Sequence, residues 1–191
     1  NLKKMNNINI YLEANPNPNS LKFVTDKMLV DEGIVKDYPD IDSATDSPIA
    51  KKLFEFDYVD RVFIMSNFIT ITKNNQIHWD NIKLELRNFI KKYIEDGKKI
   101  VELKPQKKKK FSSNKKIDKK IIEILDEYIK PAVEQDGGAI QFESFNKGKV
   151  KVSLQGACSG CPSSMITLKS GIEKLLKRFI PEVEEVVAEE V

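Results

Sequence analysis

A lysine-rich segment divides this chain into two halves and limits what it can fold into. Residues 103–116 read LKPQKKKKFSSNKK, with a proline, a lysine run and then a polar Ser-Ser-Asn. Like charges repel, and such a composition offers no apolar face to bury. A basic tract can bind nucleic acid or an anionic membrane surface, but the formal net charge of the whole chain is only +3. The segment therefore predicts a basic flexible linker between one domain at 1–102 and another at 117–191.

The length and composition of the chain fit two small domains. The chain has 191 residues, 40% of them apolar and 32% charged, which is enough for two cores with well-solvated surfaces. No stretch reaches the roughly 18 consecutive apolar residues of a membrane span. No secretory leader opens the chain. It starts at Asn1 rather than Met, which leaves open whether N-terminal residues are missing.

The half before the linker alternates between strand-like and helical patterns, so we expect an α+β domain. Ser47-Pro48 has the chemistry of a helix start, because serine caps helix N-termini and proline suits the first helical position. A helix is also predicted from the apolar spacing between Ile82 and Ile94, with Gly97 as its cap. The predicted strands are 8–12, 21–24, 59–65 and 68–73, the last two forming a hairpin.

The half after the linker predicts an α-β-β-α order with a possible last strand. An apolar helical face runs from Ile117 to Ile129 and ends near Pro131. Alternating residues around Ile140–Phe142 and Val150–Leu154 predict an antiparallel hairpin. A glycine-rich loop at 156–162 then leads into a second helix, and the last strand is expected near 183–187. The stripe expected to be buried on that helix is Met165, Leu168, Ile172, Leu175 and Leu176.

The glycine-rich loop holds the two cysteines of the chain, Cys158 and Cys161, in the order Cys-Ser-Gly-Cys. Two close cysteines in a chain without others indicate thiolate chemistry in a reducing compartment rather than structural disulfides. Pro162 suits a helix start, so the thiols are expected beside the positive end of a helix, which favours the thiolate. The predicted location is the bacterial cytoplasm, or the mitochondrial matrix if a leader has been removed.

Four interpretations of this pair follow from its spacing. Two thiolates are half of the ligands of an all-cysteine iron–sulfur cluster, so a homodimer would complete the set. The same dimer could hold zinc. Cys-x-x-Cys before a helix is also typical of thiol–disulfide oxidoreductases, although the expected element order is not the parallel βαβ pattern of a thioredoxin. The fourth interpretation is a pair of incidental thiols.

Three other groups have both a structural and a functional interpretation. Trp79, which follows the one histidine of the chain, is expected to pack in the N-terminal core. The Asp-Gly-Gly of residues 136–138 is expected to be a turn that needs glycine rather than a carboxylate placed near the loop. Ser159, Ser163 and Ser164 could donate hydrogen bonds to a cluster, but helix capping is the expected role.

Longer runs of the sequence resemble a known family. LQGACSGCPSSMITLKSGIEKLLKRFIPEVEEV, preceded by PAVEQDGGAIQF, closely resembles the C-terminal domain of NifU, the Nfu-type iron–sulfur carrier domain. ANPNPNSLKFV, SPIAKKLF and VDRVFIMSNFITITK resemble the domain that precedes it in many Nfu-type proteins. Together the two matches cover nearly all of the chain except the linker.

The resemblance implies a function and its residues. The cluster ligands would be Cys158 and Cys161, and the cofactor one [4Fe–4S] cluster bridging a homodimer, although a [2Fe–2S] cluster also takes four thiolates. Upstream iron–sulfur assembly proteins would supply the cluster, and apo iron–sulfur target proteins would receive it from an exposed loop. The scaffold and ferredoxin-like segments of full-length NifU have no counterpart in this sequence, which favours transfer over de novo assembly. Neither an enzyme nor a nucleic-acid or membrane partner is expected.

Overall fold

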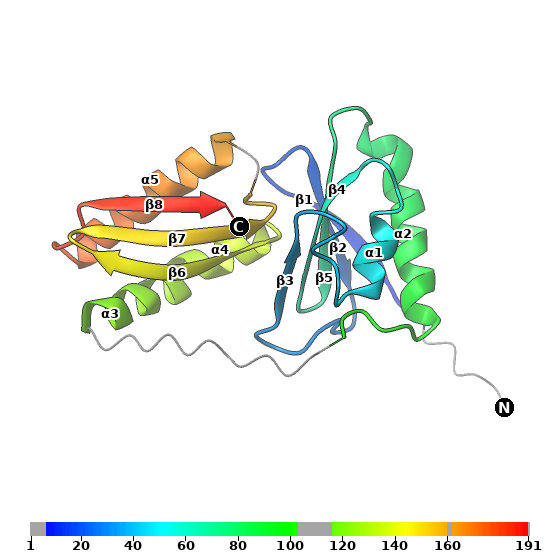
Figure 1. Cartoon of the computed structure of the whole chain (residues 1–191), viewed down its shortest axis with the longest axis horizontal. Coiled ribbons are helices and arrows are strands. Elements are labelled where there is room, and N and C mark those ends of the chain that lie inside the picture. The colour runs from blue at the N-terminus through cyan, green and yellow to red at the C-terminus, as the bar shows by residue number, and fades with distance from the viewer. Residues whose placement is uncertain (1–6, 103–115, 160–161, 191) are drawn as a thin grey trace. The chain divides into compact units, whose positions relative to one another are not determined.

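The computed structural model describes residues 7–102, 116–159 and 162–190, which divide into two compact units (Figure 1). The first unit is Asn1–Gln106 and the second is Lys107–Val191. The predicted linker, residues 103–116, lies outside the described residues except for Lys116, which begins a helix. Both units combine helices with a sheet, so the α+β class is confirmed. No helix in the described part of the chain is long and apolar enough to cross a membrane.

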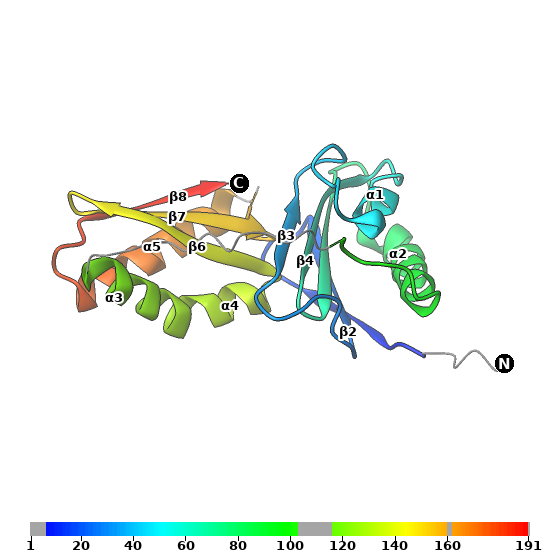
Figure 2. The ribbon, with the colours of Figure 1, turned by 60° about the horizontal axis from the view of Figure 1, so that its bottom comes forward.

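The first unit is a five-stranded antiparallel sheet in the order β1-β2-β5-β4-β3. Two helices lie on one face of it (Figures 1 and 2). The elements are β1 Ile10–Ala14, β2 Ser20–Thr25, β3 Val35–Tyr38, α1 Pro48–Leu53, β4 Val59–Met65, β5 Phe68–Lys73 and α2 Trp79–Glu95. The core fills the space between the helices and this face, with Phe23, Ile64, Ile69, Leu53 and Leu86 among its fully buried side chains.

Local sequence signals account for most of these elements. Ser47 caps α1, since its hydroxyl accepts a hydrogen bond from the Ala50 amide at 3.2 Å. Ser66, with a φ of 48°, turns the β4–β5 hairpin, and Gly97, with a φ of 70°, follows the end of α2. Trp79 packs against the core, as predicted, and its indole N–H donates to the Pro18 carbonyl at 3.1 Å. The predicted helix starts and the hairpin are therefore confirmed.

The second unit is a three-stranded sheet in the order β6-β7-β8 with its helices on one face (Figure 2). β6 and β7 form the predicted antiparallel hairpin, closed by Lys147 and Gly148, which both have positive φ. β8 is the expected last strand, and it pairs with β7 in parallel. The elements are α3 Lys116–Ile124, the π-helical turn η1 Leu125–Ile129, α4 Lys130–Gln135, β6 Gly138–Asn146, β7 Lys149–Gly156, α5 Pro162–Phe179 and β8 Glu185–Glu190.

The parallel pairing corrects one expectation. The order β7–α5–β8 is a parallel crossover, whereas the sequence was expected to lack a parallel βαβ pattern. The last strand was expected from three valines without a register. Its direction is seen only in the pairing, which runs from Lys149 with Glu185 to Leu154 with Glu190. The expected difference from the topology of a thioredoxin is therefore wrong in this respect.

The helix before β6 does not end at Pro131. It continues to Gln135, because a π-helical turn at Leu125–Ile129 shifts the hydrogen bonding just before the proline. The Lys130 amide donates to the Leu125 carbonyl, one residue further back than in an α-helix. The chain thus reaches the Asp-Gly-Gly turn with Val133 still packed in the core.

Candidate functional site

The cysteine loop joins the end of β7 to the start of α5. Gly156, the last residue of β7, has a φ of 67°, which favours glycine. It pairs with Gly138 at the start of β6, so two glycines face each other across the ladder beside the loop. Cys158 lies within the described residues, whereas Cys161 lies outside them. The predicted role of Cys161 as a ligand therefore stays a prediction.

Cys158 is buried inside its own unit. Its exposed fraction is 7%, and it belongs to the same core cluster as Leu154 and Ile172. The expectation of an exposed loop is therefore wrong for the described part, residues 157–159, which are all buried. Packing explains the difference, because the loop folds back over the end of the β6–β7 hairpin instead of projecting from it.

Gly138 makes room for Cys158. A Cβ atom at position 138 would lie 2.9 Å from the Cys158 sulfur, 3.3 Å from its amide nitrogen and 2.5 Å from the Gln155 carbonyl oxygen. Real Cβ contacts are essentially never under 3.0 Å, so the backbone of β7 and the sulfur both exclude a side chain here. From sequence, residues 136–138 were expected to be a turn and nothing more. That holds for Gly137, whose φ is 81°, but the close approach at Gly138 was missed.

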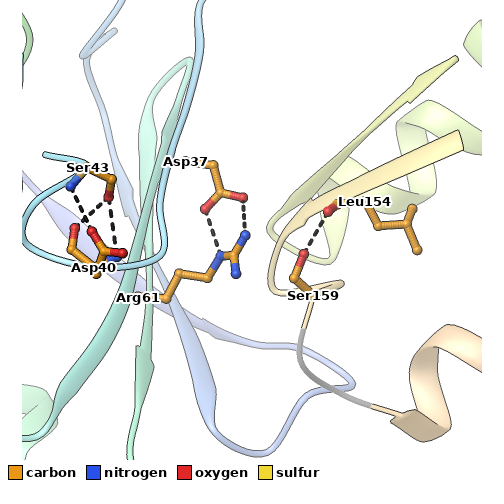
Figure 3. A network of polar contacts seen from close by, with 6 residues as sticks. All are labelled: Asp37, Asp40, Ser43, Arg61, Leu154 and Ser159. Atoms are coloured by element: carbon orange, nitrogen blue, oxygen red, sulfur yellow. Dashed lines mark hydrogen bonds and ion pairs between the residues drawn. The ribbon is translucent and has the colours of Figure 1, made fainter. Parts of the chain in front are cut away.

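Hydrogen bonds hold the described part of the loop in place. The Ala157 amide donates to the Gly137 carbonyl at 3.2 Å, and the Ser159 amide donates to the Gly156 carbonyl at 3.1 Å. The Ser159 hydroxyl, in a side chain with an exposed fraction of 2%, donates to the Leu154 carbonyl at 2.7 Å (Figure 3). Helix capping was the expected role of Ser159, whereas this hydrogen bond ties the loop back to β7.

The described residues of this chain contain no group of three or more histidine, cysteine, aspartate or glutamate side chains able to hold a metal ion. His78 is exposed and lies before α2 in the other unit. A thiol in the loop before a helix can give a soft thiolate ligand or a nucleophile. One chain by itself offers at most half of a four-thiolate set.

Each of the two units matches the model of a known protein family. Residues 10–97 match the model described as "Scaffold protein Nfu/NifU N terminal", and residues 121–187 match the model described as "NifU-like domain". The two matches stand in the order inferred from the sequence, one in each unit. Fold and loop thus define a two-domain protein of the Nfu/NifU class.

Curated proteins with similar sequences extend the match along the chain. "NFU1 iron-sulfur cluster scaffold homolog, mitochondrial" from Homo sapiens is 38% identical over 177 residues, covering 92% of this chain and 69% of that protein. "NifU-like protein 4, mitochondrial" from Arabidopsis thaliana is also 38% identical, over 94% of this chain and 65% of its own length. The chain belongs to the NFU1/NifU-like family. It spans 60% of the Drosophila grimshawi member's length.

A solved structure is also similar to part of the chain. The solution structure of a NifU-like protein from Saccharomyces cerevisiae has 26% sequence identity and a TM-score of 0.43. The similarity covers 51% of this chain and 87% of that one.

Proposed function

We propose that this protein carries an iron–sulfur cluster, [4Fe–4S], held between two copies through Cys158 and Cys161 of each, and transfers it to apo-proteins. The observation that carries the proposal is the position of Cys158. It packs closely against Gly138, at the loop before α5, in a unit that matches the NifU-like domain. Several curated relatives are named as iron–sulfur cluster scaffold homologues, which supports the same class of cargo.

Ligand counting supports the dimer. An all-cysteine cluster takes four thiolates, and the sequence of one chain contains two cysteines. A second copy of the chain, related to the first by a two-fold axis through the cluster, supplies the other two cysteines. A bridging cluster has ligands from two separable chains, so the cysteines of a recipient can replace them stepwise. In this account the cluster is cargo, and the protein is a carrier rather than an enzyme.

Burial of Cys158 adds a step to cluster uptake. The thiol that packs against Gly138 must turn outward, or the loop must move, before its sulfur can bind iron shared with another chain. The hydrogen bond from Ser159 to Leu154 holds the loop in the closed arrangement until then. Closing over the thiol also protects it from oxidation while the protein is empty.

Location and partners follow from the relatives. The human, Arabidopsis and Drosophila proteins are named as mitochondrial, so we place this protein in the mitochondrial matrix rather than the bacterial cytoplasm. Its partners there would be proteins that assemble clusters and apo-proteins that accept them. The first unit, which matches the Nfu/NifU N-terminal model, would dock some of these partners.

Anaerobic reconstitution with iron and sulfide tests the proposal. The unmodified chain should develop the absorption of a thiolate-bound cluster and pass it to an apo-ferredoxin, whereas Cys158→Ser and Cys161→Ser should not. The matched control is Ser170→Ala, at an exposed position of α5, the helix that follows the cysteine loop. A full cluster in a stable dimer of Cys158→Ser would overturn the assignment.

One observation favours a second candidate, a thiol–disulfide oxidoreductase. The parallel β7–α5–β8 crossover places the Cys-x-x-Cys loop between a strand and a helix, as redox-active pairs of this spacing require. Catalytic reduction of a protein disulfide by the iron-free monomer would support this candidate. Absence of turnover under conditions where the cluster loads would remove it.

A further inference from the structure

The longest stretch of the chain without a charged residue lies between Lys151 and Lys169. Charged residues make up 32% of the sequence, so a gap of this length needs an explanation. Burial accounts for its first part, because β7 and residues 157–159 lie in the core. It does not account for the second part, which runs along the first turns of α5.

The start of α5 has a surface unlike the rest of that helix. Ile166 has an exposed fraction of 71%, the highest among the exposed large hydrophobic side chains of the described residues. Thr167 beside it is also exposed and uncharged. Further along the same helix, charged residues return to the exposed positions, as at Lys174 and Lys177. Ile166 also lies outside the stripe that packs on the sheet, where Met165 and Leu168 contact the core.

This surface adjoins the cysteine loop. Ile166 follows Pro162 by four residues, or about 6 Å along the helix axis. A cluster held by two copies brings the surfaces around both loops together, so exposed side chains within a turn or two of the loop lie where the partner chain would approach. An exposed apolar side chain within a surface depleted of charge has the composition of an interface core.

We propose that Ile166, with Thr167 beside it, packs against the same surface of a second copy when the two chains share a cluster. The inference rests on the proposed function, which requires two copies. A two-fold axis through the cluster places the two α5 starts on either side of it. The isoleucines then exclude water next to the iron-bound thiolates, and the contact stabilises the loaded dimer over the empty one.

Concentration-dependent reconstitution of the full-length chain tests this. Ile166→Asp should weaken the cluster-bound dimer about tenfold or more, because losing a central interface side chain commonly costs that much. Loss should appear as monomer by native mass and as fewer irons per chain at low protein concentration, and high concentration should restore both. Ile166→Ser should give a smaller shift in the same direction. Leu84→Asp, at a 55% exposed position of α2 in the other unit, should have no effect.

The outcomes separate the inference from the function. Dimerisation and loading of Ile166→Asp and Ile166→Ser equal to those of the unmodified chain would overturn the inference and leave the function standing. Normal dimers of both variants with slow delivery to apo-ferredoxin would also overturn it, since the surface would then bind recipients. If the unmodified chain takes up no cluster, the proposed function itself fails. Far-UV circular dichroism checks that each variant is folded.

Discussion

At the scale of single residues, the position of the Cys158 sulfur depends on the absence of a side chain at Gly138. The sulfur and the Gln155 carbonyl occupy the space that a Cβ would fill. The resulting pocket keeps the thiol within its own unit, beside the strands that carry the loop. The Cys158 thiol is therefore held in place without being exposed.

Gly138→Ala should destabilise the second unit and increase the reactivity of Cys158. Overpacking at this site forces β7 or the loop to move, at a cost of about 1–3 kcal/mol. Fluorescence of Trp79, the one tryptophan, reports on the first unit, so the urea transition followed by fluorescence should not change. The urea transition of the second unit, followed by circular dichroism, should move to a lower urea concentration. Thiol labelling of the native protein should become faster.

Gly171→Ala is the control for this substitution. Gly171 lies in α5, and a Cβ atom added there would meet nothing within 4 Å, so alanine should stabilise the helix by about 0.5–1 kcal/mol. Equal effects of the two substitutions on stability and labelling would contradict the role assigned to Gly138.

At the scale of elements, β3 shows how tertiary contacts form a strand that its own sequence does not indicate. Val35–Tyr38 has too short an alternation to be predicted, and no strand was expected there. It pairs with β4, and the Asp37 carboxylate accepts two hydrogen bonds from the Arg61 guanidinium at 2.8 and 2.7 Å (Figure 3). These partners are distant in sequence, so no local pattern contains them.

The same strand is linked to α1 through Asp46. The Tyr38 hydroxyl donates to this carboxylate at 2.7 Å and the Lys36 ammonium at 2.5 Å. Burial by itself raises the pKa of Asp46, but the hydrogen bonds from Lys36 and Tyr38 outweigh it and hold the pKa below its ordinary value of 3.8. A carboxyl whose folded pKa is lowered stabilises the fold above the ordinary pKa, and this contribution disappears as the pH falls through the lowered value.

Asp46→Asn should therefore destabilise the first unit in a pH-dependent way. At neutral pH we expect a loss of about 2 kcal/mol, because a half-buried ion pair and its hydrogen bonds are broken. The loss should shrink as the pH falls below the ordinary value of 3.8 toward the lowered pKa of the folded state, where the carboxylate of the unmodified chain becomes protonated. Urea transitions followed by Trp79 fluorescence measure both. As a control, Asp42→Asn, at an exposed position of the same loop, should change the stability of the first unit little. A loss of stability in Asp46→Asn that does not depend on pH would argue against this network.

The sequence was most informative where local chemistry determines the structure. Caps, turns and alternating patterns predicted α1, the β4–β5 hairpin, the β6–β7 hairpin and the start of α5 at Pro162. It failed where distant segments decide the outcome, as in the strand β3, the parallel direction of β8 and the close approach of Gly138 to Cys158. The π-helical turn before Pro131 was missed because proline was expected to end the helix.

At the scale of the whole molecule, each unit has its own hydrophobic core. One core lies between α1, α2 and the five-stranded sheet, and the other lies between α3, α5 and the three-stranded sheet. Two separate cores are expected to fold separately, because burial within each does not depend on the other. Cluster binding and partner docking can therefore be divided between the units.

Deletion of residues 1–103 should separate these two roles. The shortened chain should still take up a cluster, since the second unit keeps its core and its cysteine loop. Delivery to some apo-proteins should become slower, because the unit proposed to dock them is gone. Stopped-flow transfer to a panel of apo-proteins measures this, and unchanged rates for every recipient would show that the first unit does not dock partners.

The central claim is that two copies of this chain share one cluster through four cysteines. Counting iron and sulfide per chain after anaerobic reconstitution, on the same sample whose native mass is measured, tests it most directly. The account predicts a dimer with about two irons and two sulfides per chain, as a shared [4Fe–4S] cluster requires. A monomer that retains a complete cluster, or a dimer that binds zinc and no iron, would contradict it.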